Sequence, residues 1–278
     1  MVYSRQVDAI AKLNVSVTGP ADAPPMIFAH GFGCDQHMWR HVAPAFSDRF
    51  RVVLFDYVGC GGSASSAWNP DRYSSLSGYA ADVLDLVREL DLRDAIFVGH
   101  SVSSMIGALA VAQEPDRFAG LVMIGPSPRY IDDPGASYVG GFGEADIDEL
   151  LGSLASNYLG WSSAMAPVIM GNAERPELGQ ELTESFCRMD PAIAEQWARV
   201  TFLSDNRADL AKVPVPTLVL QCREDAIAPV AVGEYVERAL PDAELVVLDA
   251  TGHCPNLSAP GPTVRAIAAF VDRSRAVA

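Results

Sequence analysis

The sequence predicts an α/β fold, with a mainly parallel central sheet, helices on both faces of that sheet and an inserted group of helices. Short apolar runs alternate with amphipathic helical patterns over most of the 278 residues. Such alternation is typical of parallel sheets covered by helices. The alternation stops between residues 126 and 212, where helical patterns follow one another without a strand. We therefore expect one sheet domain with a helical insertion.

The elements of the sheet domain follow from the spacing of their apolar residues. Strands are expected near residues 14–18, 25–30, 51–57, 94–99, 120–125, 216–222 and 243–249. Helices are expected near residues 5–12, 40–46, 76–91, 102–113, 230–240 and 260–274. A chain of this length can bury a large core within a single domain.

The insertion contains four further helical patterns, separated by residues that commonly end or begin a helix. These helices are expected near residues 144–159, 161–170, 176–188 and 191–203, with breaks at Gly160, Gly171-Asn172 and Asp190-Pro191. We expect them to form a four-helix lid over residues 135–205, inserted after the sixth strand of the fold. Residues 1–134 and 206–278 would then form the core.

Composition excludes several classes of function. The chain carries 35 acidic and 20 basic residues, a formal net charge of −15, which disfavours nucleic acid and anionic membranes as partners. Its apolar runs are too short to span a bilayer, and no basic segment leads into an apolar signal sequence. The five cysteines form no C-x-x-C pair. We therefore expect a cytoplasmic protein with free thiols, no metal and no cofactor.

The most informative segment is Gly99-His100-Ser101-Val102-Ser103, which joins an apolar run to a helical pattern. A serine on a tight strand-to-helix turn is exposed as a nucleophile, and such a turn needs small residues two positions either side of the serine. Gly99 meets this need. Ser103 stands where a second glycine is usual and is small enough to fit. The segment therefore predicts Ser101 as a nucleophile.

A nucleophilic serine needs a base and a group that orients the base. In this kind of fold the three follow in the order serine, acid, histidine, each after a strand. Asp225 follows one predicted strand, and His253 follows the next within a Gly-His-x-Pro loop. Glu224 is the competing acid, but Asp225 lies nearer the apolar stretch that would wall a pocket. For His253, the alternative is a solvated loop histidine.

Two backbone N–H groups are needed to bind the oxyanion that forms during acyl transfer. One would come from Val102, directly after the nucleophile. The other would come from Phe32, in the His30-Gly31-Phe32-Gly33 segment that follows an early strand. A simple glycine-rich turn is the alternative explanation of this segment.

A competing motif lies in residues 59–64, which formally match the dinucleotide pattern G-x-G-x-x-A. That pattern binds a pyrophosphate only when a helix begins on its glycines. Here a loop sequence follows, so the glycines are interpreted as a turn near the active site.

Several motifs together resemble one branch of the α/β-hydrolases. They are HGFGCDQHMW (30–39), FDYVGCGGS (55–63), FVGHSVSSMIG (97–107), MIGPSPRYIDDP (123–134), LQCREDAIAP (220–229) and TGHCPN (251–256). This branch contains the bacterial stress regulator RsbQ and the plant strigolactone and karrikin receptors, and an RsbQ-like bacterial protein is the expected type. The resemblance implies an α/β-hydrolase fold, a Ser101-Asp225-His253 triad and the oxyanion donors Phe32 and Val102.

The residues and the resemblance together predict a serine hydrolase for a small hydrophobic ester, lactone or similar acyl compound. Candidate pocket residues are Phe32, Trp161, Met165, Leu182 and Ile227, although each could equally pack within the lid. The RsbQ resemblance implies a stress-signalling role with a partner such as a sensor-domain phosphatase. A plain intracellular carboxylesterase or lactonase, or a cofactor-free perhydrolase, would use the same triad.

Overall fold

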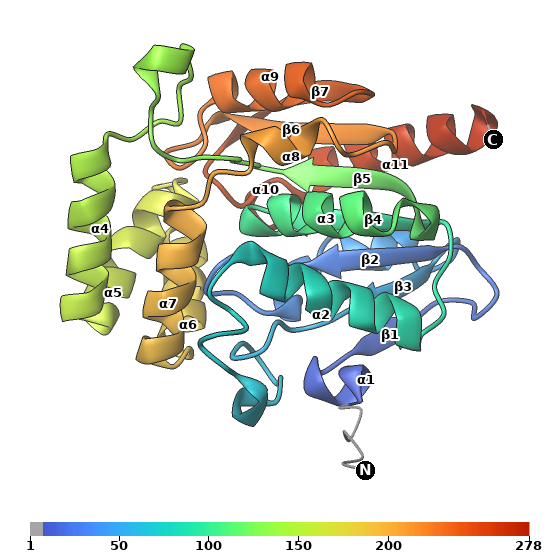
Figure 1. The fold of residues 1–278 in the computed structure, drawn as a ribbon, viewed down its shortest axis with the longest axis horizontal. Helices are drawn as coiled ribbons and strands as arrows, with labels where there is room; N and C mark the ends of the chain where they lie inside the picture. Colours follow the sequence, from blue (N-terminus) through green and yellow to red (C-terminus); the bar gives the residue numbers. More distant parts are fainter. Residues whose placement is uncertain (1–7, 278) are drawn as a thin grey trace.

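The computed structural model describes residues 8–277, and side chains as far as residue 274. Within this range the chain forms a seven-stranded sheet in the order β1-β3-β2-β4-β5-β6-β7 (Figure 1). Only β1 is antiparallel to its neighbour. The strands are β1 (Ser16–Thr18), β2 (Pro25–Ala29), β3 (Arg51–Leu54), β4 (Ala95–His100), β5 (Phe118–Ile124), β6 (Thr217–Glu224) and β7 (Ala243–Thr251).

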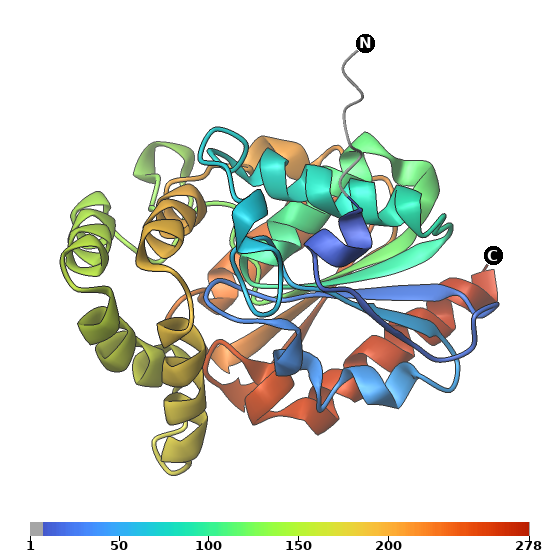
Figure 2. The same cartoon turned by 90° about the horizontal axis from the view of Figure 1, so that it is seen from below.

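Helices cover both faces of the sheet, as the alternating pattern predicts; Figure 2 shows α2 and α3 on one face and α11 on the other. The helices of the sheet domain are α1 (Ala9–Lys12), α2 (Leu76–Glu89), α3 (Val102–Gln113), α8 (Arg207–Leu210), α9 (Val230–Ala239), α10 (Pro255–Ser258) and α11 (Pro260–Val277). Short 3₁₀ turns are η1 (Gln36–Trp39), η2 (Ala43–Phe46), η3 (Ser65–Ala67), η4 (Pro115–Arg117) and η5 (Pro134–Ala136).

Two of the expected helices differ from the structure. The pattern near residues 40–46 forms turns and the single 3₁₀ turn η2 instead of an α-helix, and Pro44 has no N–H to donate within a longer helix. The expected helix near 5–12 is described only from Ala9, and residues 5–7 lie outside the described part of the chain.

The centre of the sheet is buried on both sides. Every residue of β2 and β4 is buried, because parallel strands are covered by helices on both faces and therefore consist of nearly continuous apolar residues. The nucleophile segment follows β4 directly, so its position is determined by the best-packed strands of the fold.

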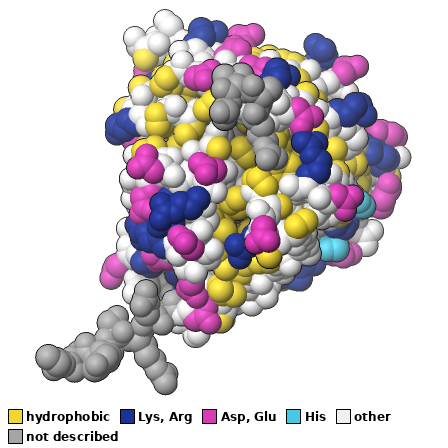
Figure 3. All heavy atoms as spheres, turned by 90° about the vertical axis from the view of Figure 1, so that its right-hand side faces the viewer, with side chains coloured by type: hydrophobic (Ala, Val, Ile, Leu, Met, Phe, Trp, Pro, Cys, Tyr) yellow, Lys and Arg dark blue, Asp and Glu magenta, His cyan; other side chains and the backbone are white. Residues whose placement is uncertain are grey.

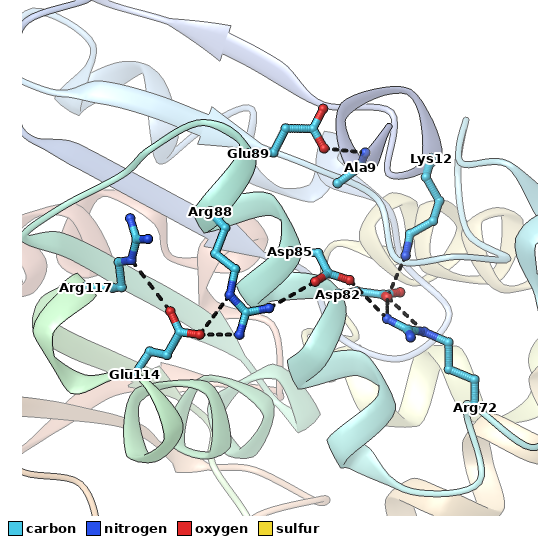
Figure 4. Close-up of polar contacts among 9 residues, drawn as sticks. All are labelled: Ala9, Lys12, Arg72, Asp82, Asp85, Arg88, Glu89, Glu114 and Arg117. Carbon is cyan, nitrogen blue, oxygen red and sulfur yellow. Dashed lines mark hydrogen bonds and ion pairs between the residues drawn. The ribbon is translucent and has the colours of Figure 1, made fainter. Parts of the chain in front are cut away.

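A buried carboxylate fastens α2 to the segments that precede it (Figure 4). Asp82 is fully buried and accepts hydrogen bonds from Lys12 Nζ at 2.6 Å and from the Tyr73 hydroxyl at 2.6 Å. The Arg72 guanidinium makes a further ion pair with it. Burying a carboxylate is costly unless charged or polar partners surround it, so these contacts favour one arrangement of α1, α2 and the loop between η3 and α2.

Four helices form a separate group beyond one end of the sheet (Figure 1). They are α4 (Glu144–Ser156), α5 (Tyr158–Met170), α6 (Pro176–Cys187) and α7 (Pro191–Phe202). They follow β5, the fifth strand along this chain, where the sequence interpretation counted a sixth. The first break lies at Asn157 rather than Gly160, because the Asn157 side chain accepts a hydrogen bond from the Gly160 N–H and caps α5.

The face of the molecule opposite α4, α5, α6 and α7 carries basic and acidic side chains close together (Figure 3). No helix between residues 8 and 277 is long and apolar enough to cross a membrane. The same residues contain no cluster of three or more histidine, cysteine or acidic side chains that could hold a metal ion.

Candidate active site

Ser101 lies on a strained turn between β4 and α3. Its backbone has φ 56° and ψ −124°, a conformation that is costly for a residue with a side chain and is found mainly at functional sites. The Ser101 N–H donates to the Ile124 carbonyl at 2.7 Å, which fixes the turn. A Cβ atom on Gly99 would lie 2.4 Å from the Ser103 carbonyl oxygen, so the close approach of strand and helix requires glycine there.

The structure brings the three residues of the expected triad together. The Ser101 Oγ lies 2.8 Å from His253 Nε2, and His253 Nδ1 lies 2.7 Å from Asp225 Oδ2. Because an ionised carboxylate can only accept, Nδ1 carries the ring proton and Nε2 presents a lone pair to the serine hydroxyl. All three residues come from loops at the carboxyl edge of the sheet, after β4, β6 and β7.

Asp225 is held as a carboxylate. Burial alone raises the pKa of Asp225, but His253 and the N–H groups of Ile227 and Ala228 outweigh that effect, so the pKa lies below its usual range. The two N–H groups donate to Oδ1 at 2.8 and 3.1 Å. Glu224, the competing acid, is exposed and accepts instead from the Thr251 hydroxyl at 3.1 Å.

The two expected oxyanion donors flank the same site. Val102 is the first residue of α3, and Phe32 lies in the loop after β2 and lines a cavity beside Ser101. Among the described residues, no carbonyl or side chain accepts a hydrogen bond from the N–H of Phe32 or of Val102. Both N–H groups are therefore free to bind an oxygen of a substrate.

The cavity beside Ser101 has a volume of about 30 Å³. Four of the expected pocket residues line it: Phe32, Trp161, Leu182 and Ile227. Met165 does not line it, which corrects the expectation. Its side chain is half-buried and belongs to the hydrophobic packing of the protein, the alternative already open from the sequence.

Sequence reasoning missed several residues of the cavity wall. They are Cys34, His100, Tyr130, Ile169, Thr201, Phe202 and Cys254. Cys34, His100, Tyr130 and Cys254 lie within the motifs quoted above and could have been found from that position. Burial raises the pKa of Cys34 to about 12 and that of Cys254 well above its usual range. Both thiols therefore stay protonated, and neither competes with Ser101 as a nucleophile.

Two other features lack the chemistry of the Ser101 site. A groove of about 530 Å³ between the start of α2 and the end of α7 is larger than the Ser101 cavity, but none of the three triad residues lines it. The residues 59–64 form turns followed by η3, with no α-helix on their glycines. A dinucleotide site therefore has no support there.

Known proteins of similar sequence and structure support the fold described above. The alpha/beta hydrolase family pattern matches residues 26–266. Karrikin insensitive 2 receptor CA of Petunia hybrida is 39% identical over 248 residues, covering 89% of this chain and 91% of that protein. Strigolactone esterase RMS3 of Pisum sativum is 37% identical over 253 residues, covering 89% and 92%. The structure of a hydrolase from Oleispira antarctica has a TM-score of 0.92 at 39% identity, covering 95% and 96%.

The fold and the family pattern define the class: the chain belongs to the alpha/beta hydrolase family. It is an ester-cleaving hydrolase. Its similarity to the plant proteins supports the strigolactone and karrikin receptor-like branch within that family.

Proposed function

We propose that this chain hydrolyses small apolar esters or lactones through an acyl-enzyme formed on Ser101. The observation that supports this most strongly is the continuous pair of hydrogen bonds from Asp225 through His253 to Ser101, at 2.7 and 2.8 Å. Such an arrangement lowers the barrier for a serine that is otherwise a weak nucleophile.

In the first half of the reaction, the Ser101 Oγ attacks the substrate carbonyl carbon while His253 Nε2 accepts the hydroxyl proton. The carbonyl oxygen becomes an oxyanion, which the N–H groups of Phe32 and Val102 stabilise. The intermediate collapses, the ester C–O bond breaks, and His253 returns the proton to the departing alcohol oxygen. Asp225 orients the imidazole and stabilises its charged form.

In the second half, a water molecule attacks the acyl-enzyme while His253 Nε2 accepts one of its protons. The second tetrahedral intermediate releases the carboxylic acid, and the proton returns to Ser101. With a lactone, the departing alcohol and the released acid belong to the same molecule. A perhydrolase would replace water by hydrogen peroxide at this step.

The size and lining of the cavity support a small substrate. Aromatic and aliphatic side chains dominate the wall, and the Phe32 and Trp161 rings pack edge to face with centroids 6.1 Å apart. Several wall residues come from α5, α6 and α7, among them Trp161, Leu182 and Phe202, so a ligand in the cavity contacts these helices. We propose that these helices belong to a lid of residues 135–205 on a core of 1–134 and 206–278, and that this lid moves as substrate enters and leaves.

We further propose an RsbQ-like stress-signalling role in the cytoplasm, in which turnover is reported to a sensor-domain phosphatase. The name of the petunia relative, a receptor, supports a signalling role. The alternative is a carboxylesterase or lactonase without a signalling partner. Co-purification of the chain with such a phosphatase, dependent on Ser101, would support the signalling role. Equal binding by Ser101→Ala in the presence of substrate would count against it.

The hydrolytic proposal is tested with p-nitrophenyl acetate in the absence of added metal. We expect Ser101→Ala and Asp225→Asn to lose activity by about 10³-fold or more. Glu224→Gln is the matched control, because Glu224 is the neighbouring carboxylate and does not contact His253; it should stay within about threefold of the parent chain. Equal losses in the Asp225 and Glu224 variants would contradict the assignment.

A further inference from the structure

We propose that Ser103 is a positioning residue for the oxyanion hole, acting through His30 on the Gly31–Phe32 peptide. This inference rests on the proposed function, and it adds a role for the serine that stands where the nucleophile turn commonly has glycine. Ser103 is fully buried and is the second residue of α3, two positions after the nucleophile.

The hydroxyl of Ser103 joins two loops at the carboxyl edge of the sheet. Its Oγ lies 2.5 Å from the His30 carbonyl oxygen and 3.0 Å from the Tyr57 hydroxyl. The carbonyl oxygen has no proton, so Ser103 donates to His30. Because a serine hydroxyl has a single proton, the Tyr57 hydroxyl must then donate to Ser103.

The His30 ring continues this chain of hydrogen bonds. The Tyr57 N–H donates to His30 Nε2 at 3.1 Å, so Nε2 is the unprotonated nitrogen. His30 Nδ1 therefore carries the proton and donates to the Gly31 carbonyl oxygen at 2.9 Å. Burial lowers the pKa of His30 and keeps the ring neutral, which this pattern requires.

The Gly31 carbonyl and the Phe32 N–H belong to the same peptide unit. That unit is planar and trans, so the two groups point in opposite directions. The Gly31 carbonyl oxygen accepts hydrogen bonds from the His30 ring and, at 3.3 Å, from the Cys34 N–H. These two bonds fix the direction of the Phe32 N–H. The bond between Ser103 and His30 thus sets the position of this oxyanion donor relative to Ser101.

A glycine at position 103 would leave the turn intact but could not make this connection. The neighbouring Ser104 offers a matched control: it is also fully buried in α3, but its hydroxyl donates to the Gly99 carbonyl of β4 at 3.0 Å and makes no hydrogen bond to the loop that carries Phe32. Ser103→Ala and Ser104→Ala therefore each remove one buried hydroxyl, and only the first disconnects the Phe32 loop.

The test combines p-nitrophenyl acetate kinetics with inhibition by ethylboronic acid, which forms a tetrahedral anion on a nucleophilic serine. For Ser103→Ala we expect kcat to fall about tenfold, less than the 10²–10³ lost when a donor is removed outright, with KM within about twofold. The boronate inhibition constant should rise by a similar factor. Ser104→Ala should keep the kcat of the parent chain, and Ser103→Thr, which retains the hydroxyl, should restore most of it.

Equal kinetics for Ser103→Ala and Ser104→Ala would overturn the inference, as would a fall in kcat without weaker boronate binding. If Ser103→Ala does not fold, Ser103→Cys supplies the test, because a thiol has a similar shape but is only a weak donor to the His30 carbonyl; a kcat and boronate affinity equal to those of the parent chain would then contradict the proposal. Failure of the proposed function has a different signature, since the parent chain would then be inactive or Ser101→Ala would be active.

Discussion

The backbone N–H of His253 donates to the carbonyl oxygen of Ile169, near the end of α5 in the proposed lid, at 2.9 Å. Asn172 strengthens this connection, because its side-chain amide donates to the Met170 and Thr251 carbonyls at 2.8 Å each. A Cβ on Gly252 would lie 1.8 Å from the Met170 oxygen, so the two segments meet backbone to backbone. A rearrangement of the lid would therefore act directly on the loop that carries His253.

We expect hydrogen exchange to slow across residues 135–205 when Ser101 is modified by a small phosphonate, while the strands of the sheet stay unchanged. Trp161, Leu182 and Phe202 of the proposed lid line the cavity beside Ser101, so a bound group contacts the lid, and a ligand shifts a conformational equilibrium only toward states that it binds better. The exchange of the His253 amide should change together with the lid. Unchanged exchange in the lid would remove the structural basis for the signalling role.

A second hydrogen bond, to the backbone carbonyl of His253, also positions this residue. His100 Nε2 lies 2.7 Å from the His253 carbonyl oxygen and donates to it. His100→Leu would leave that buried carbonyl without a partner, at a cost of about 1–3 kcal/mol, and we expect kcat to fall with it. His100→Gln keeps an N–H donor and should lose less. Urea unfolding and kinetics on both variants check this; equal behaviour of the two would contradict a hydrogen-bonding role.

Stability should decline as the pH falls below about 6.5. Burial, and then the charge of His253, lower the pKa of His100 to about 3. Between pH 6.5 and 3 the unfolded chain therefore binds a proton that the folded chain does not, so acid favours unfolding. His30 and Asp225 act in the same direction, because the pKa of each is also lowered.

For His100 alone, this linkage amounts to about 2 kcal/mol between pH 7 and pH 5. The measurement is the free energy of unfolding in urea at pH 7, 6 and 5, with His100→Gln as the control that should show a weaker dependence. A stability that stays constant from pH 7 to pH 5 would contradict a neutral, buried His100.

Much of the fold could be predicted because it depends on local signals. The apolar runs that form β2 and β4 and the order of Ser101, Asp225 and His253 are readable along the chain. The choice of Asp225 over Glu224 agrees with the geometry, in which only Asp225 reaches His253.

Other parts of the site depend on contacts between distant segments. Thr201 and Phe202 reach the cavity from α7, and no local pattern marks them. Met165 is a candidate pocket residue from the sequence but belongs to the hydrophobic packing. At Ser103 the sequence accounted for a small side chain, whereas the hydroxyl bond to His30 appears only when the two loops are brought together.

The central claim is that Ser101 is the nucleophile, and the most direct test is mass-spectrometric mapping of a fluorophosphonate adduct while hydrolysis of p-nitrophenyl acetate is followed. Since Ser101 lies 2.8 Å from His253 Nε2, we expect about one equivalent of label, located on Ser101, with activity lost in proportion to labelling. Ser101→Ala should take up no label. Inactivation with the adduct on another residue and Ser101 unmodified would contradict the account.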